Sequence, residues 1–260
     1  MTRRRFYAPP DAFNSSLDRV TLESDEARHL RDVLRLKTGD EVYVFNGTGR
    51  EFHCRVEQSR RDSAQLEVIA EVDPARAESP LRLTLAVALL KGEKFDLVVQ
   101  KATELGVTRV APVVTKLADI RLRDTSDAAK RVARWQRIAL EAAKQSGRAV
   151  VPEITIPVPF DSLIRDAGYP KDAGDEPESN RLLFSEREGQ SILEAKAAMP
   201  TKPSSIVALV GSEGGWTDAE LAAAREAGWT IVTLGGRTLR AETAGIAVTV
   251  LLQHVFGDLS

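Results

Sequence analysis

Two glycine-rich segments near the C-terminal end carry the side chains best suited to chemistry. The first, residues 209–216, contains Glu213, and the second, residues 234–244, contains Arg240 and Glu242. Each follows an apolar run typical of a buried strand and precedes a helical pattern. Open α/β sheets bind ligands at the carboxyl ends of their strands, where glycine lets a ligand approach the backbone closely. The two segments therefore predict one shared ligand site.

The simpler alternative is that such segments are only strand-to-helix connectors. The familiar nucleotide patterns are missing: the α/β part has no Gly-x-Gly-x-x-Gly after its first strand and no Gly-x-x-x-x-Gly-Lys-Ser/Thr. Gly-x-Ser-x-Gly, typical of serine hydrolases, is also absent. The three histidines (His29, His53 and His254) have no metal-ligand spacing, so we expect no metal site.

The N-terminal residues predict a small β-barrel with one early helix. Apolar spacing indicates a helix over 25–36, and Asn46-Gly47 marks a turn between strands. The expected strands are 42–45, 51–56 and 64–72. Residues 74–80 have proline at both ends and read as a linker. The predicted domains are therefore 1–73, the barrel, and 81–260.

The second domain alternates strand and helix patterns, which predicts an α/β fold with a mainly parallel sheet and helices on both faces. Ser191 with Glu194, and Thr217 with Glu220, have the capping-box spacing of helix starts. The expected strands are 81–90, 109–114, 151–156, 182–184, 206–210 and 231–234. The expected helices are 93–105, 128–145, 191–199, 217–228 and 242–256.

The composition is that of a soluble globular protein, with 260 residues, 43% apolar and 28% charged. No apolar run reaches the roughly 18 to 20 residues of a membrane span, and no apolar segment follows Arg3-Arg4-Arg5, so we expect a cytoplasmic protein without a signal peptide. The single cysteine, Cys54, excludes an internal disulfide and is expected to be buried. The net charge is −2, but residues 116–148 hold nine lysines and arginines against four acids, a local bias that suits a polyanion.

Several ordered segments resemble the bacterial 16S ribosomal RNA uridine-1498 N3-methyltransferases, and together they span nearly the whole chain. In the first domain these are Arg4-Arg5-Phe6-Tyr7 and His29-Leu30-x-x-Val33-Leu34-Arg35-Leu36. In the second they begin with Lys91-Gly92-Glu93-Lys94, Gln100-Lys101-Ala102-Thr103-Glu104-Leu105-Gly106-Val107 and the basic pattern from Arg134-Trp135 to Arg148. They end with Gly211-Ser212-Glu213-Gly214-Gly215 and Leu234-Gly235-x-Arg237-x-Leu239-Arg240-x-Glu242-Thr243-Ala244.

The resemblance implies a PUA-like β-barrel followed by a SPOUT methyltransferase domain whose C-terminal chain forms a trefoil knot. It also implies S-adenosylmethionine as cofactor, 16S ribosomal RNA of the small subunit as substrate, and a homodimer. The family commonly has proline where this chain has Ser212. Because the neighbouring glycines and Glu213 remain, we expect cofactor binding to survive this change.

Methylation of uridine N3 requires that an imide proton leave while negative charge spreads over O2 and O4. We expect Arg240 to stabilise that charge, because a guanidinium stays ionised and offers several donors. Glu213 or Glu242 could accept the proton or orient Arg240. The structural alternatives are loop-fixing hydrogen bonds for the two glutamates and a salt bridge within the knot for Arg240.

The resemblance assigns further residues to the cofactor and to RNA. Besides Glu213 and Arg240, the expected cofactor site consists of Phe184, Ser185, Leu209, Gly211, Gly214, Gly215, Leu234, Gly235, Leu239, Thr243 and Ala244. The expected RNA-binding residues are Arg3, Arg4, Arg5, Arg28, Arg35, Arg134 and Arg137.

Two alternative functions remain open from the sequence. The chain could be a SPOUT methyltransferase acting on transfer RNA or on another ribosomal position. It could also be a non-catalytic RNA-binding factor of ribosome assembly, for which a barrel and a basic surface would suffice. Cofactor binding separates the second alternative from an enzyme.

Overall fold

The computed structural model describes residues 3–120, 124–166 and 180–259. The chain divides into two units, of which the first comprises Met1–Glu78 with Leu140–Val151 and the second Ser79–Ala139 with Pro152–Ser260. The change of unit at Glu78 lies within the expected linker, whereas no sequence signal predicts that residues 140–151 group with the first unit. Part of the basic stretch, residues 121–123, lies outside the described residues.

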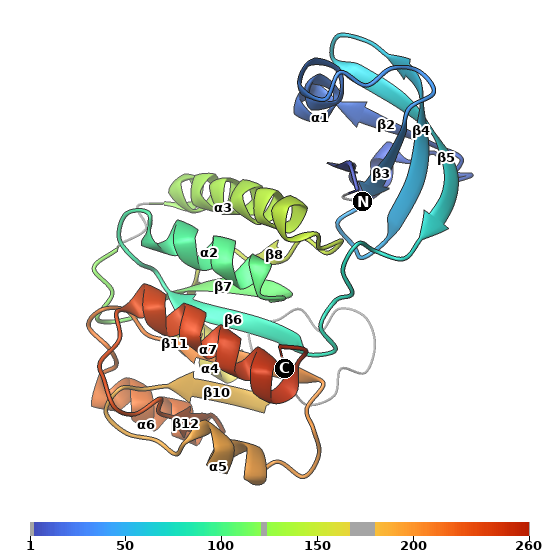
Figure 1. Cartoon of the computed structure of the whole chain (residues 1–260). Coiled ribbons are helices and arrows are strands. Elements are labelled where there is room, and N and C mark those ends of the chain that lie inside the picture. Colours follow the sequence, from blue (N-terminus) through green and yellow to red (C-terminus); the bar gives the residue numbers. More distant parts are fainter. Residues whose placement is uncertain (1–2, 121–123, 167–179, 260) are drawn as a thin grey trace. The chain divides into compact units, whose positions relative to one another are not determined.

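The first unit is a curled five-stranded sheet with the strand order β1-β3-β4-β5-β2 (Figure 1). Its strands are β1 (Arg5–Tyr7), β2 (Arg19–Glu23), β3 (Glu41–Phe45), β4 (Glu51–Ser59) and β5 (Ser63–Val72). β1 pairs parallel with β3, and the other neighbours are antiparallel. A short 3-10 helix, η1 (Pro10–Ala12), follows β1. Asn46 shapes the β3–β4 turn, since its Oδ1 accepts hydrogen bonds from the backbone N–H groups of Thr48 and Arg50.

The single helix expected over 25–36 is wrong in its second half. The structure has a short α1 (Ser24–Arg28) that continues as a π-helical turn, η2 (His29–Val33). Leu30 is buried, but Val33 is 68% exposed, so the apolar spacing does not follow one buried face. Arg35 then adopts a positive φ of 53° and ends the segment.

A buried carboxylate stands at the centre of the first unit. Glu51 is fully buried, its Oε1 accepts from Arg3 at 2.9 Å, and its Oε2 accepts from Arg5 at 3.0 Å and from the backbone N–H of Ala75 at 3.1 Å. Arg5 also donates to the carbonyl of Arg148 at 2.9 Å. Since both oxygens have charged donors, this cluster meets the condition for a stable buried ion pair.

A second ion pair fastens the expected linker to the first unit. Arg148, 5% exposed, donates to the Glu78 carboxylate at 2.7 Å, and the backbone N–H of Val150 donates to its other oxygen at 3.1 Å. The linker is therefore held at both Ala75 and Glu78, although its composition suggested a free connector.

The second unit is built on a parallel sheet with the strand order β12-β10-β11-β6-β7-β8, and β9 pairs with β7. Its strands are β6 (Arg82–Ala88), β7 (Arg109–Val114), β8 (Glu153–Ile154), β9 (Val158–Pro159), β10 (Asn180–Phe184), β11 (Ser205–Val210) and β12 (Thr230–Val232). The run expected over 151–156 is thus a strand for only two residues. The predicted α/β class with a parallel sheet is confirmed.

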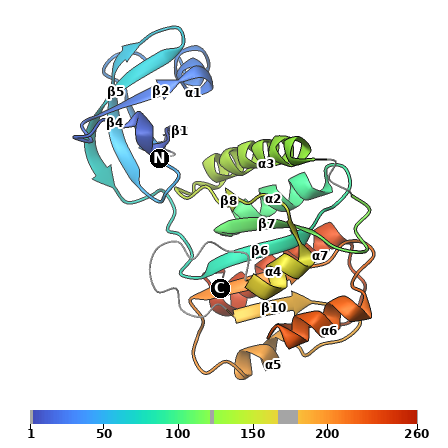
Figure 2. The same ribbon diagram turned by 180° about the vertical axis from the view of Figure 1, so that it is seen from behind.

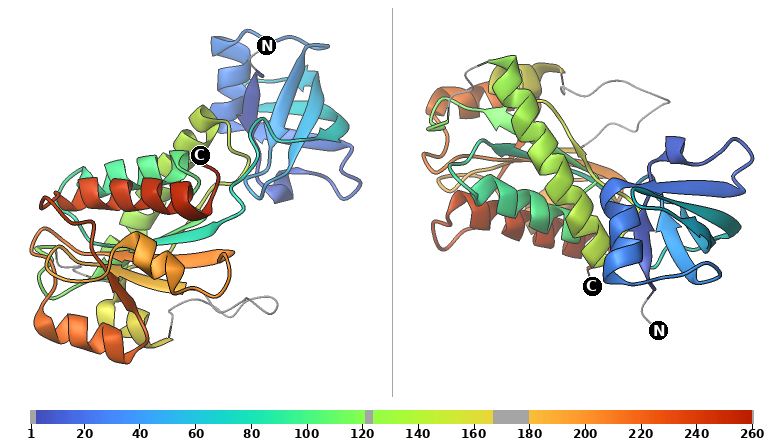
Figure 3. Two further views of the ribbon diagram at one scale, coloured as in Figure 1. Left: turned by 60° about the horizontal axis from the view of Figure 1, so that its bottom comes forward. Right: turned by 90° about the horizontal axis from the view of Figure 1, so that it is seen from above.

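Helices cover both faces of this sheet. They are α2 (Lys94–Glu104), α3 (Thr125–Ser146), α4 (Phe160–Asp166), α5 (Ile192–Ala197), α6 (Asp218–Glu226) and α7 (Ala241–Phe256). Figure 1 shows α2 and α7 on one face, side by side as also seen in Figure 3, and Figure 2 shows α4 and α6 on the other. Among the described residues, none of the helices combines the length and apolarity of a membrane span.

Local sequence signals explain where several of these elements begin. Both predicted capping boxes are present, with Ser191 and Thr217 each accepting from the backbone N–H of the glutamate three residues later.

The expected trefoil knot concerns how the chain threads through itself, which strand pairing does not describe, so it stays a prediction.

Candidate functional site

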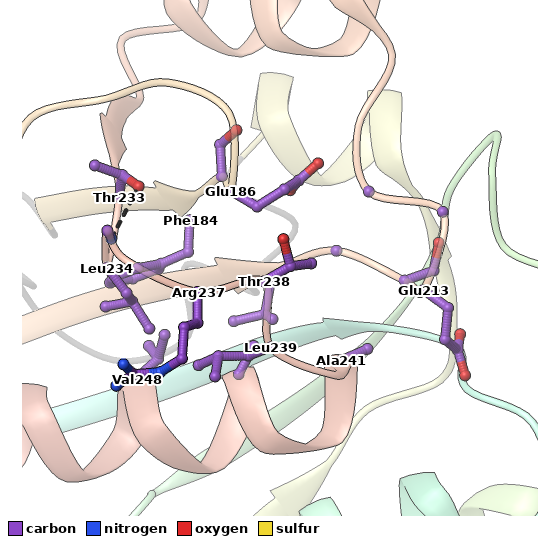
Figure 4. A pocket seen from close by; sticks show the side chains of 18 of the residues that line it. Phe184, Glu186, Glu213, Thr233, Leu234, Arg237, Thr238, Leu239, Ala241 and Val248 are labelled. Carbon is purple, nitrogen blue, oxygen red and sulfur yellow. Dashed lines mark hydrogen bonds between the residues drawn. The ribbon is translucent and has the colours of Figure 1, made fainter.

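A pocket lies at the carboxyl ends of the parallel strands in the second unit. It encloses about 250 Å³ between the segments that follow β10, β11 and β12 and the first two turns of α7 (Figure 4). Both glycine-rich segments contribute to its wall, which confirms that they share one cavity. Its lining residues are Phe184, Ser185, Glu186, Val210, Gly211, Ser212, Glu213, Gly214, Gly215, Thr233, Leu234, Gly235, Gly236, Arg237, Thr238, Leu239, Ala241, Ala244 and Val248.

The segment after β11 is fixed by a buried tryptophan. Trp216, 2% exposed, donates from Nε1 to the carbonyl of Phe184 at 2.9 Å and so ties this segment to the end of β10. Gly215 turns the chain with a φ of 68°, and a Cβ there would lie 2.5 Å from Oε1 of Glu186. The positive φ favours glycine at this position, where the backbone itself forms the pocket wall.

The segment after β12 supplies the apolar part of the pocket. Figure 4 shows Leu234 and Leu239 beside Phe184, with Val248 of α7 below them. The hydroxyl of Thr233 accepts from the backbone N–H of Gly235 at 3.2 Å and holds the start of this segment. An apolar wall facing polar backbone suits a ligand that is partly aromatic and partly charged.

Ser212 brings an unpartnered hydroxyl to the pocket. It is 7% exposed, and its Oγ has no hydrogen-bond partner among the described residues. Its carbonyl accepts from the backbone N–H of Gly215 at 3.0 Å, so the turn keeps its shape without proline. A buried hydroxyl without a partner is costly, which favours a ligand atom as its partner.

Charged side chains gather at the rim of the pocket, next to Glu213. Lys94, the first residue of α2, donates to Oε1 of Glu213 at 2.7 Å and lies 4.0 Å from Oε2 of Glu242. Burial acts to raise the pKa of Glu213, but the hydrogen bond and charge of Lys94, together with a backbone hydrogen bond, outweigh it and hold that pKa below its usual range. The hydrogen bond to Glu213 raises the pKa of Lys94, although the positive charge of Arg240 acts to lower it. Both members of the pair are therefore ionised at neutral pH.

Most of the expected cofactor residues meet in the pocket, but three of them (Leu209, Arg240 and Thr243) lie outside its lining. Leu209 belongs to the core, because successive side chains of a strand point to opposite faces, and its neighbour Val210 takes the pocket position. Thr243 is exposed on α7. Arg240 and Glu242 are not among the lining residues, and both interact with Lys94 at the rim.

The site also contains residues that were not among the expected site residues, although Lys94 and Arg237 belong to the segments that carry the family resemblance. Glu186, Arg237 and Thr238 line the pocket, and Lys94 organises its rim. A signal for Lys94 was available, since it follows the strand that pairs with β11 and parallel neighbours end at the same edge.

The expected RNA-binding arginines fall into two groups. Arg4, Arg35 and Arg137 are exposed and have no ion-pair partner among the described residues. Arg28 pairs with Asp25 at an exposed position, and Arg134 pairs with Asp96.

Arg3 and Arg5 form the other group, since both bind Glu51. The Arg5 side chain is only 8% exposed. The structure therefore gives Arg5 a structural role, and its expected contact with RNA stays a prediction.

Two other expectations concern cysteine and metal. Cys54 is fully buried, and burial raises the pKa of its thiol to about 12, which excludes a reactive thiolate. No group of three or more potential metal-ligating side chains is found in the described part of the chain.

Comparisons with known proteins match both units. Residues 77–253 match the family model described as an RNA methyltransferase domain, and residues 22–69 match the RNA methyltransferase PUA domain. A Synechocystis protein named ribosomal RNA small subunit methyltransferase E is 35% identical over 94% of this chain and 75% of its own length. The protein of that name from Bacillus subtilis is 31% identical over 86% of this chain and 85% of its own length.

Solved structures are similar over the full length. A ribosomal RNA small subunit methyltransferase E from Neisseria gonorrhoeae, bound to S-adenosyl methionine, has a TM-score of 0.83 and 33% identity, with 100% of both chains covered. A Legionella pneumophila methyltransferase in complex with the same cofactor has a TM-score of 0.82 and 28% identity, also with 100% coverage of both chains. The predicted PUA-like module followed by a SPOUT-type parallel domain is thereby confirmed. From both units and from the pocket at the strand ends, we conclude that the chain belongs to the RNA methyltransferase family represented by these proteins.

Proposed function

We propose that this protein transfers the methyl group of S-adenosylmethionine to N3 of a uridine in 16S ribosomal RNA of the small subunit. The observation that carries the proposal is the pocket at the strand ends, with a charged rim beside it, in a chain that matches named relatives over both units. Relatives named for the small-subunit ribosomal RNA support that RNA as the substrate.

The pocket fits the cofactor. Phe184, Leu234 and Leu239 offer apolar surface to a purine, while backbone groups and the Ser212 hydroxyl offer polar contacts. The cofactor supplies a methyl group on a positively charged sulfur, which is already activated for transfer. The residues of this chain must therefore align the acceptor nitrogen and manage its proton and charge.

Arg240 is the proposed stabiliser of the negative charge that spreads over the uracil oxygens. It stands at the N-cap of α7, it is exposed, and it has no ion-pair partner among the described residues. The alternative role, a salt bridge within the knot, therefore has no support in the described part of the chain. A guanidinium beside the uracil oxygens would stabilise this charge by donating hydrogen bonds to them.

RNA contacts are proposed for two sets of arginines, considered separately. In the first unit these are Arg4, Arg28 and Arg35, and on α3 they are Arg134 and Arg137. Such contacts fix the position of the RNA more than they read its sequence. The target base must then leave its stack to reach the methyl group.

We also propose a homodimer, which light scattering on the purified protein will test.

The decisive experiment is nucleoside mass spectrometry of 16S ribosomal RNA from a deletion strain, before and after adding the protein with S-adenosylmethionine. We expect N3-methyluridine to be absent before and present after the addition. Methylation at another atom or in transfer RNA would reassign the substrate. Titration calorimetry that detects no cofactor binding would instead favour a non-catalytic assembly factor.

A further inference from the structure

The two glutamates at the pocket rim differ in the hydrogen bonds that their carboxylate oxygens accept. Oε1 of Glu213 accepts the 2.7 Å hydrogen bond from Lys94. The Glu242 side chain is 13% exposed, and its Oε2 is buried without a hydrogen-bond partner in the described part of the chain. Its nearest cation, Lys94, is at ion-pair distance only, 4.0 Å away.

Buried polar atoms without partners gather at this edge of the sheet. Besides Oε2 of Glu242, they include Oγ of Ser212 in the pocket wall and Oγ1 of Thr115, which directly follows β7 and is 4% exposed. Leaving such atoms unpaired is costly, and of the five found in the described part of the chain, these three lie at the edge that also forms the pocket, whereas Ser59 Oγ and Gln253 Nε2 lie elsewhere. A carboxylate oxygen in this condition needs a donor, and the imide N3–H of uracil is one.

We propose that Glu242 accepts the imide proton of the target base, and that Lys94 is a positioning residue that keeps Glu213 from this task. This inference rests on the proposed function and deepens it, because the function alone leaves the two glutamates equivalent. Lys94 occupies the Glu213 carboxylate by a direct hydrogen bond, whereas Glu242 receives only its electrostatic attraction. One oxygen of Glu213 is thus occupied by Lys94, whereas the buried Oε2 of Glu242 has no hydrogen-bond partner in the described part of the chain.

The chemical step balances with the groups named. The N3 proton passes to Oε2 of Glu242, and the N3 electron pair forms the new bond to the methyl carbon. The carbon–sulfur bond breaks with its electron pair left on sulfur, which becomes neutral. Arg240 stabilises the charge on the uracil oxygens during transfer, and Glu242 afterwards releases its proton to water.

The charges around Glu242 come from several elements. Lys94 of α2 lies 4.0 Å from it, Glu213 in the segment after β11 binds the same lysine, and Arg240 is the N-cap of the helix that carries Glu242. Further out, Asp119 acts on Glu213, and Lys91 pairs with Asp119 at 2.7 Å. Lys94 is thus the cation at ion-pair distance from Glu242 in the described part of the chain.

The test compares Glu242→Gln with Glu213→Gln in single-turnover methylation across pH 7 to 9, on small ribosomal subunits from the deletion strain. Wild-type protein, with its own base, is expected to show a nearly flat profile. Glu242→Gln is expected to lose about 10²- to 10⁴-fold at pH 7 and to regain about tenfold for each pH unit, because solvent must then remove the proton. Glu213→Gln is expected to be slower than wild type but to keep the flat profile.

Lys94 is tested by a readout that does not depend on turnover. In protein labelled with ¹³C at glutamate side chains, Lys94→Met should raise the pKa of Glu213, because burial then acts without the hydrogen bond. Lys94→Arg should restore the low pKa. Cofactor affinity, measured by calorimetry, should change by less than about threefold in the Glu242 and Lys94 variants, which also shows that they are folded.

The outcomes separate this inference from the proposed function. If wild-type protein forms no N3-methyluridine, the proposed function fails. If it does, but the steep pH profile appears in Glu213→Gln rather than in Glu242→Gln, the roles of the two glutamates are reversed and the inference fails. It also fails if both variants keep the flat profile, or if Lys94→Met leaves the pKa of Glu213 unchanged.

Discussion

Two clusters of charged side chains, one in each unit, differ in how fully their carboxylate oxygens are hydrogen-bonded. Around Glu51, both carboxylate oxygens accept hydrogen bonds, from Arg3, from Arg5 and from the backbone of Ala75. At the pocket rim, Lys94 donates a hydrogen bond to Glu213, but its Nζ lies 4.0 Å from Oε2 of Glu242, which is too far for a hydrogen bond.

This difference helps to distinguish charged residues that stabilise the fold from those that act in the reaction. A satisfied buried cluster contributes to stability, since removing one partner leaves an uncompensated charge. An incomplete cluster costs stability and is retained where a ligand completes it. Substitutions in the first cluster should therefore change unfolding, and substitutions in the second should change methylation.

The largest expected effect is on folding. Arg5→Ala should lower the free energy of unfolding by about 3 kcal/mol, because Glu51 loses a partner while fully buried. Its neighbour Arg4 is exposed and makes a matched control, with an expected change within about 0.5 kcal/mol. Urea unfolding followed by circular dichroism measures both. Equal stability of the two variants would break the comparison.

Arg240→Ala should leave folding intact and remove about 10²- to 10³-fold of the methyl-transfer rate, as expected for one oxyanion donor. The guanidinium is exposed and has no ion-pair partner among the described residues, so stability should change little. Single-turnover kinetics and calorimetric cofactor titration test the two parts. A turnover close to that of wild type would remove Arg240 from the mechanism.

A smaller effect is expected on RNA binding. The double variant Arg4→Ala with Arg35→Ala should weaken binding to ribosomal RNA about tenfold and reduce the salt slope by about two. Cofactor affinity should not change. Filter binding at several salt concentrations is the measurement, with Arg50→Ala as control, because Arg50 is held by Glu71. If the control weakens binding equally, the exposed arginines have no special role.

The smallest effect is expected at Ser212. Ser212→Pro should change cofactor affinity by less than about threefold, since the turn is closed by the carbonyl of this residue, which proline also has. Ser212→Ala removes the same hydroxyl and should weaken binding to a similar extent if that hydroxyl contacts the ligand. Calorimetry of both variants tests this, and a tenfold loss in Ser212→Pro would show that this backbone has diverged.

The sequence predicted the parts of the fold that depend on local signals. The capping boxes at Ser191 and Thr217 and the buried strands β6, β7 and β11 lie within a few residues of their expected positions. Local signals fail where a segment makes few regular contacts, as at η2. The glycine-rich segments were identified because their composition is itself the signal.

The rest depends on contacts between distant residues. Nothing in the run Arg4-Arg5 distinguishes the exposed arginine from the buried one, because the difference lies in Glu51, 46 residues from Arg5. Likewise Leu209 and Val210 are both apolar, and only the sheet shows which of them faces the pocket. Lys94 and Glu213 are 119 residues apart, and parallel pairing of β6 with β11 brings their segments together.

The placement of the single thiol has a practical consequence. Cys54 is buried in the first unit, and burial raises its pKa to about 12, so an alkylating reagent can modify it only when that unit opens. All three tryptophans (Trp135, Trp216 and Trp229) belong to the second unit. Thiol labelling therefore follows the opening of the first unit, and tryptophan fluorescence follows the second. The two signals together show whether the units unfold together or in sequence, without any engineered probe.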